Sequence, residues 1–297
     1  MPAPRISFVG FGEVASAFSK AIRENGAEVA AYDVNLTRTG GADRLERRVR
    51  APGIQFRPLP EAVRGADFVL STVRSQTAPA AARECAAHLK PGQLFVDFNS
   101  TSPAVKREIA GIIRPSGADF VEGAILGAVG ATGAATPALT GGEKGQAAAT
   151  ELSRLGLRVS YFSGELGQVS LFKMLRSVFS KGVEALLLEL MVAGRRAGLE
   201  EPLWDDLVRD LMTRTPFEKV ASNWVQTHPG ASARRHHEMT QVVETLRELG
   251  VDPLMTRATE AFFRRSCELG LAKAFPEKPA SVGAVVEVLN QRLGELR

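Results

Sequence analysis

Cysteine is scarce in this sequence of 297 residues, which contains only Cys85 and Cys267. The two are far apart and match no metal-binding or redox spacing, so we expect reduced, structural thiols and no metal site. Long hydrophobic runs are also absent, because the most apolar one, residues 185–193, is short and contains Glu189. No basic-then-apolar signal pattern opens the chain. These absences predict a cytoplasmic protein that does not enter a membrane.

Internal repeats, low-complexity segments and nucleic-acid-binding motifs are absent as well. The net charge of +4 and the pI near 9.3 would suit a nucleic-acid partner. However, the densest basic cluster, formed by Arg44, Arg47, Arg48 and Arg50, has no interleaved aromatic residues. We interpret it as a solvated helix face, with a polyanion site as the alternative. The length favours two domains, each large enough to bury its own core.

The most informative stretch of the sequence is residues 5–33. A short apolar run, Ile6 to Val9, is followed by Gly-Phe-Gly-Glu-Val-Ala at positions 10–15, then by a helix-compatible segment and a second apolar run that ends in Asp33. This order predicts a strand, a glycine turn, a helix and a second strand. It fits the dinucleotide-binding βαβ fingerprint in its G-x-G-x-x-A form.

Each position of the fingerprint has a physical reason. Gly10 permits the tight turn, Gly12 lets the backbone approach a pyrophosphate, and Ala15 keeps the helix close to the strand. The pyrophosphate would lie on the helix N-terminus, where free N–H groups favour an anion. Asp33 would accept hydrogen bonds from the adenosine ribose. We therefore predict a cofactor site at Gly10, Phe11, Gly12, Glu13, Val14 and Asp33.

Strands and helices then alternate until about residue 163. Strands are expected at residues 66–73, 94–97, 120–125 and 159–162, and beyond Gly167 the pattern is helical only. We predict an α/β fold, in which a Rossmann-type, doubly wound parallel sheet is joined by a long interdomain helix to an all-α C-terminal domain. The predicted domains are residues 1–163 and 164–297, and the long helix covers residues 168–194.

Ligands collect beyond the carboxyl ends of the strands in such sheets, so the loops there are candidate binding sites. Two such loops are residues 73–77 and 98–103. We assign Val73, Arg74, Thr77 and Ser100 to the cofactor and Asn99 to the substrate. Helix capping by Ser102 and Pro103 explains the loop at residues 98–103 equally well. Gly127 and Ala128, in a later loop of small residues, are assigned to the substrate, and a flexible turn is the alternative.

A polar stripe lies near the start of the long helix. Lys173, Arg176, Ser177 and Ser180 are spaced so that they share one face. Such a stripe is usually solvated. Because it follows the cofactor domain directly, we interpret it as part of the active site.

Together these residues resemble the β-hydroxyacid dehydrogenase family, the relatives of 6-phosphogluconate dehydrogenase, over nearly the whole chain. The similarity rests on the glycine fingerprint, the polar loop between Asp97 and Pro103, and the lysine near the start of the long helix. Residues 98–103 and 167–174 are most similar to a less characterised branch with a distinct C-terminal helical domain.

The resemblance implies that Lys173 is the general acid/base, that the cofactor is a nicotinamide dinucleotide and that the protein is a homodimer. It also places Arg176, Ser177 and His237 in the substrate site, and a solvated helix start is the alternative for His237. The sequence departs from the family at two points. The family's serine-glycine-glycine loop falls on residues 126–128, without its serine, and the asparagines after the lysine fall on Arg176 and Ser177.

We therefore expect an NAD-dependent oxidoreductase that acts on a small hydroxy acid or its oxo form, without a nucleic-acid partner. NADP is not excluded, because Arg38 could reach a 2′-phosphate. The alternatives are an imine reductase-like enzyme and a dinucleotide-binding sensor without turnover.

Overall fold

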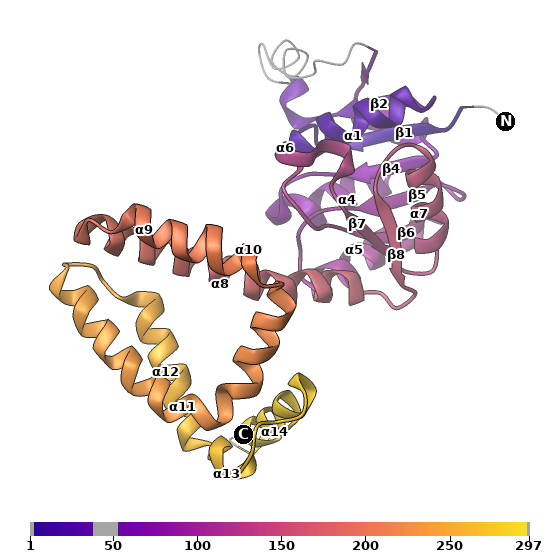
Figure 1. The fold of residues 1–297 in the computed structure, drawn as a ribbon. Helices are drawn as coiled ribbons and strands as arrows, with labels where there is room; N and C mark the ends of the chain where they lie inside the picture. The colour runs from indigo at the N-terminus through magenta and orange to yellow at the C-terminus, as the bar shows by residue number, and fades with distance from the viewer. Residues whose placement is uncertain (1–2, 38–52, 296–297) are drawn as a thin grey trace. The chain divides into compact units, whose positions relative to one another are not determined.

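The computed structural model describes residues 3–37 and 53–295, which form two compact units, Met1–Ser177 and Val178–Arg297 (Figure 1). The first unit contains a sheet of eight strands in the order β3-β2-β1-β4-β5-β6-β7-β8. Its strands are β1 (Arg5–Val9), β2 (Glu28–Tyr32), β3 (Gln55–Phe56), β4 (Phe68–Ser71), β5 (Leu94–Asp97), β6 (Asp119–Ile125), β7 (Ala138–Gly141) and β8 (Val159–Ser163).

The strand order identifies the switch point of the sheet. From β1 the chain moves outward to β2 and β3, and then returns to β4 on the other side of β1. This is a doubly wound sheet, in which the crevice above β1 and β4 is the expected ligand site. The predicted Rossmann-type fold is confirmed.

One strand runs against the prediction of a fully parallel sheet. β7 pairs antiparallel with β6, whereas the other neighbouring strands are parallel. The connection between these two strands holds only the short helix α6 (Val129–Thr132) and a 3₁₀ turn. A parallel return needs a longer crossover, so the chain turns back on itself here.

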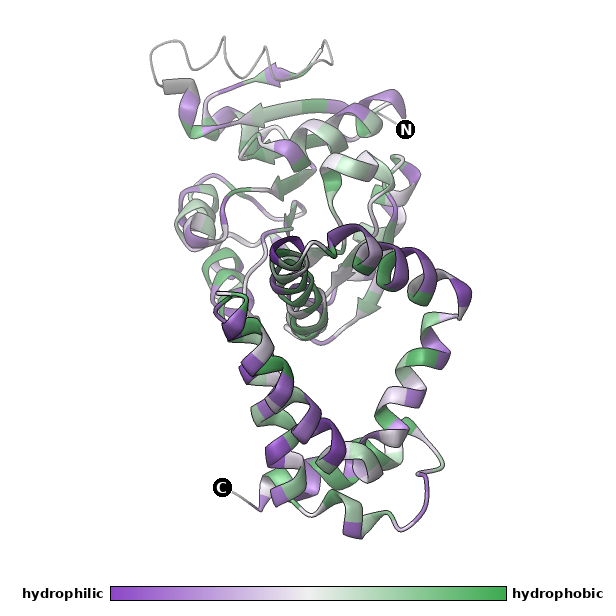
Figure 2. Ribbon diagram, turned by 60° about the vertical axis from the view of Figure 1, so that its left-hand side comes forward, coloured by the Kyte–Doolittle hydropathy of each residue, from purple (hydrophilic) through white to green (hydrophobic). Residues whose placement is uncertain are grey.

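Helices cover both faces of the sheet. One face buries α1 (Glu13–Glu24) and α7 (Gly145–Arg154) in a core that includes Phe18 and Leu152, and the other buries α3 (Leu59–Arg64), α4 (Ala78–Ala86) and α5 (Pro103–Ile113). Figure 2 shows green, hydrophobic colour along the strands between these layers. Burial of both faces explains why the strands are continuous apolar runs.

The long helix α8 (Gln168–Ala197) begins in the first unit and continues into the second, with Gly182 in its interior. The remaining helices are α9 (Glu200–Trp204), a π-helical segment (Asp205–Leu211), α10 (Met212–Arg214), α11 (Phe217–Glu248), α12 (Leu254–Glu268), α13 (Leu271–Ala274) and α14 (Val282–Gly294). The all-α prediction for this part is confirmed. Among the described residues, no helix has the length and apolarity required to cross a membrane.

Candidate cofactor and active site

The glycine turn after β1 has the geometry that the fingerprint predicts. Gly10 has φ +86°, and a Cβ there would lie 2.8 Å from the Val73 side chain, so only glycine fits. Gly12 is the N-cap of α1 without a side-chain cap, and a Cβ added to it would meet nothing within 4 Å. The N-terminus of α1 therefore faces open space that an anion can enter.

Asp33, directly after β2, is buried and fastens the turn. Its Oδ2 accepts a hydrogen bond from the Phe11 N–H (2.8 Å), and its Oδ1 accepts two from Asn35, at 2.9 Å from the backbone N and 2.7 Å from Nδ2. A carboxylate offers about four acceptor positions, so capacity for a ribose hydroxyl remains. Asp33 thus has a structural role that the sequence did not predict.

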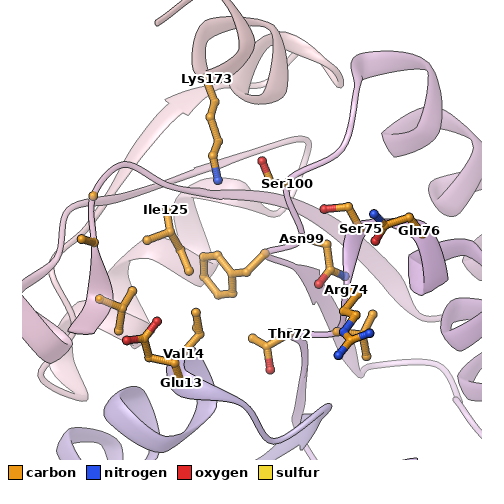
Figure 3. A pocket seen from close by; sticks show the side chains of 15 residues that line it. Glu13, Val14, Thr72, Arg74, Ser75, Gln76, Asn99, Ser100, Ile125 and Lys173 are labelled. Carbon is orange, nitrogen blue, oxygen red and sulfur yellow. The ribbon is translucent and has the colours of Figure 1, made fainter. Parts of the chain in front are cut away.

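A pocket of about 470 Å³ opens beyond the carboxyl ends of β1, β4, β5 and β6. The residues predicted for the site that line it are Glu13, Val14, Val73, Arg74, Asn99, Ser100, Gly127, Ala128 and Lys173. Figure 3 shows the Lys173 amine directed into this pocket, with Asn99 and Ser100 on one side of it. Residues predicted for the cofactor, the substrate and catalysis therefore meet in one cavity.

The Lys173 amine in this pocket has a lowered pKa. Burial, followed by the positive charges of Lys106 and Arg176, lowers its pKa from 10.5 to about 8. A lowered pKa close to neutrality is typical of lysines that exchange protons. Arg176 itself is exposed, and the Ser177 hydroxyl donates to the Lys173 carbonyl (2.9 Å).

Glu122 of β6 fixes the start of the helix that carries Lys173. Its fully buried carboxylate accepts hydrogen bonds from the backbone N–H groups of Gly167 and Ser170, both at 2.7 Å. These donors have no partner inside the helix, and a carboxylate also stabilises the positive end of the helix dipole. Glu122 therefore anchors α8 on the sheet.

The other predicted site residues lie elsewhere. Phe11 is buried in the core, and the Thr77 hydroxyl donates to the Arg74 carbonyl (3.0 Å) instead of lining the pocket. His237 lies on α11 in the second unit with an exposed side chain. Arg38 and the basic cluster at residues 44–50 lie outside the described residues.

Sequence reasoning did not assign several residues of the site. Thr72, Ser75, Gln76, Phe98, Ile125 and Val129 also line the pocket. Lys106 of α5 forms a buried ion pair with Asp97, the last residue of β5 (2.8 Å). A signal for Lys106 was available, because it precedes Ile109, Ala110 and Ile113 at the spacing of one buried helix face.

The site fits a dinucleotide. The open N-terminus of α1 suits a pyrophosphate, Asp33 lies at the end of the neighbouring strand, and the pocket extends over β4 and β5 on the other side. Within residues 3–37 and 53–295, no group of three or more His, Cys, Asp or Glu side chains is arranged to hold a metal ion. The described residues therefore define a nucleotide-binding α/β protein with a half-buried amine in its pocket.

The NAD-binding domain of 6-phosphogluconate dehydrogenase matches residues 5–159, and the chain belongs to this family of NAD(P)-binding dehydrogenases and reductases. Residues 195–266 match a second family, a domain of unknown function designated DUF1932. The resemblance inferred from the sequence is confirmed, including the distinct C-terminal domain.

Solved structures agree with this assignment. A conserved hypothetical protein from Sinorhizobium meliloti 1021 is 31% identical over 97% of this chain and 96% of its own, with a TM-score of 0.59. A conserved protein of unknown function, described as similar in structure to 3-hydroxyacid dehydrogenases, is 30% identical over 89% of this chain and 97% of its own, with a TM-score of 0.58. The imine reductase from Myxococcus stipitatus, solved with NADP+, shares the fold at 21% identity over 90% and 95%, with a TM-score of 0.66.

Proposed function

We propose that this protein is an NAD-dependent oxidoreductase that transfers a hydride between nicotinamide and a small hydroxy acid or its oxo form, with Lys173 as general acid/base. The observation that carries this proposal is the half-buried Lys173 amine, which has a pKa of about 8 and points into the pocket of a dinucleotide-binding sheet (Figure 3). A surface lysine would keep its ordinary pKa near 10.4 and stay charged.

The chemistry divides between the cofactor and the chain. A nicotinamide dinucleotide held at the glycine turn and Asp33 would supply hydride transfer to and from the carbinol carbon. The neutral Lys173 amine takes the hydroxyl proton during oxidation, and the ammonium returns it to the carbonyl oxygen during reduction. Because the pKa of about 8 is close to neutral pH, both forms of the amine are populated.

The charges around Lys173 support an acidic substrate. Arg176 lies one helical turn away, close enough for its charge to lower the pKa of the amine. A guanidinium pairs well with the planar carboxylate of a hydroxy acid. Arg176 stands where the family has an asparagine, and no serine precedes Gly127, so the acid that fits differs from those of the better-known relatives.

A cofactor turnover assay across a panel of substrates tests the proposal. NAD+ with short hydroxy acids, and NADH with the matching oxo acids, aldehydes and cyclic imines, would be followed at 340 nm. We expect turnover with at least one hydroxy acid and its oxo form. Turnover of imines alone would favour the reductase alternative, and tight NADH binding without any turnover would favour a sensor; either result contradicts the proposal.

A further inference from the structure

A buried ion pair between Lys106 and Asp97 lies next in sequence to the pocket residues Phe98 and Asn99, and neither of its groups exchanges the substrate proton in the proposed reaction. Lys106 and Asp97 each have a side chain that is 1% exposed, and the Lys106 Nζ lies 2.8 Å from Asp97 Oδ2. The same ammonium donates to the Asp97 carbonyl (2.6 Å) and the Gly123 carbonyl (3.1 Å). All three of its donors are therefore used, and its position is fixed by β5 and β6.

The second oxygen of Asp97 controls the Asn99 side chain. Asp97 Oδ1 accepts from the Asn99 backbone N–H (3.3 Å) and from Asn99 Nδ2, which also donates to Ser71 Oγ (2.8 Å). A carboxylate can only accept hydrogen bonds, so the amide nitrogen has to face Asp97. The Asn99 amide consequently has one orientation.

The amide oxygen of Asn99 is left without a partner. Asn99 is buried and lines the pocket, and no described residue donates to its Oδ1. A buried acceptor without a donor is unfavourable, so such an atom in a ligand pocket indicates a donor on the ligand. The ligand group that meets Asn99 is therefore an O–H or N–H.

We propose that Lys106 is a positioning residue of the cofactor site: by holding Asp97, it fixes the Asn99 side chain so that its oxygen accepts a hydrogen bond from a hydroxyl of the nicotinamide ribose. This inference rests on the proposed dinucleotide cofactor. With the pyrophosphate at α1 and the adenosine toward Asp33 and β2, the other half of the dinucleotide extends over β4 and β5. Asn99 follows β5 directly, and ribose hydroxyls are donors.

A buried ion pair is a poor source of stability, because desolvation of both charges offsets their attraction. The proposed role in positioning Asn99 accounts for this pair without a contribution to stability. A neutral partner at position 97 could donate as well as accept, and it would leave the Asn99 amide free to turn over. Lys106 donates to Asp97 Oδ2, which leaves Oδ1 facing the Asn99 amide nitrogen.

A double-mutant cycle on NADH affinity tests the inference. The dissociation constant of NADH would be measured by fluorescence titration for the wild type, Lys106→Met, Asn99→Ala and the double variant. Each single variant should weaken NADH binding about tenfold, the value of one hydrogen bond. The double variant should lose no more NADH affinity than either single variant, because both substitutions remove the same contact with the cofactor.

A second probe separates positioning from general damage. ADP keeps the adenosine and pyrophosphate but lacks the nicotinamide ribose, so its affinity should be unchanged in Lys106→Met. If Lys106→Met does not fold, Lys106→Met with Asp97→Asn replaces the charged pair by a neutral one and is measured in its place. Arg83→Met is the matched control: it removes an exposed ion pair to Glu108, on the same helix as Lys106, and should leave NADH binding within about twofold.

Three results would overturn the inference. The first is an unchanged NADH affinity in Lys106→Met, and the second is a double variant whose loss of NADH affinity equals the product of the two single losses. The third is a loss of ADP affinity in Lys106→Met as large as its loss of NADH affinity. None of these measurements needs turnover. A protein that binds NADH but converts no compound of the panel would refute the proposed reaction, and the role of Lys106 in NADH binding could still be tested by the double-mutant cycle.

Discussion

Lys173 belongs to a polar stripe of its helix, a position that usually faces solvent. Burial in the pocket is nevertheless the largest cause of its lowered pKa. The charge of Arg176, one helical turn away, lowers the pKa further. The structure adds burial and the charge of Lys106, a residue distant in sequence, which no local pattern relates to Lys173.

Replacement of Lys173 by alanine should reduce kcat by about 10²- to 10⁴-fold, the usual contribution of a general acid/base. NADH affinity should remain within about threefold, because no hydrogen bond between the lysine and the cofactor is required by the mechanism. Lys173→Arg should not restore turnover, since a guanidinium stays protonated. Steady-state kinetics and NADH titration of the three proteins would measure this. Lys173→Ala that retains more than about a third of wild-type kcat would exclude the lysine from the chemistry.

The rates of substrate oxidation and of the reverse reduction should depend on pH in opposite ways. Oxidation needs the neutral amine, so its rate should rise as the pH passes upward through about 8. Reduction needs the ammonium, so its rate should fall over the same interval. Rates at saturating substrate between pH 6 and 10 would show both limbs. If both directions respond to pH with the same sign, Lys173 does not carry the proton.

At the scale of elements, the glycine turn between β1 and α1 is coupled to β2 through Asp33, which accepts from the Phe11 N–H. The carboxylate therefore lies beside the part of the site that we assign to the adenosine ribose. A 2′-phosphate would bring a second negative charge to the same place, and juxtaposed like charges cost several kcal/mol.

We accordingly predict a preference for NAD(H) over NADP(H) of at least about tenfold in kcat/KM. Asp33→Ala should narrow this ratio, while the loss of its bond to Phe11 weakens both cofactors. Parallel kinetics with the two cofactors would measure it. Equal efficiency, or higher efficiency with NADP(H), would show that Asp33 does not select the cofactor.

Glu122 provides a test of how α8 is anchored. Glu122→Gln would place an amide N–H₂ against one of the two backbone donors, Gly167 N–H or Ser170 N–H. We expect the free energy of unfolding to fall by about 2 kcal/mol, as for other bonds to buried charged groups. Urea titration would measure it, with the exposed Glu108→Gln as the control, which should change stability by less than about 0.5 kcal/mol. Equal effects of the two substitutions would contradict the anchoring role.

Most of the sheet could be predicted from the sequence, because strands buried on both faces are short apolar runs and glycine turns mark their ends. The direction of β7 could not, because an isolated apolar run carries no information about its neighbour. The pocket loops could be predicted from the rule that ligands bind beyond strand ends. The role of Glu122 could not be predicted, because the first of its hydrogen-bond partners, Gly167, lies 45 residues later in the chain.

At the scale of the whole molecule, the two units differ in how well they bury apolar side chains. The first has two extensive cores, one on each face of the sheet. In the second, the hydrophobic cluster among the described residues consists of Ala193, Leu246 and Val251. Large apolar side chains on α8 remain exposed, including Val178 and Leu188, at 74% and 63%. Exposed apolar surface of this kind marks an interface.

We therefore propose a homodimer in which a second copy covers the exposed apolar side chains of α8. Light scattering at micromolar concentration should give twice the mass of the 31.8 kDa chain. Leu188→Glu should shift the mass toward the monomer, because a charge at a buried contact is costly. Arg83→Gln, which changes the net charge by the same amount at an exposed position of α4 in the first unit, should leave the dimer intact. A monomeric wild type, or a Leu188→Glu variant as dimeric as Arg83→Gln, would show that this surface of α8 is not the interface.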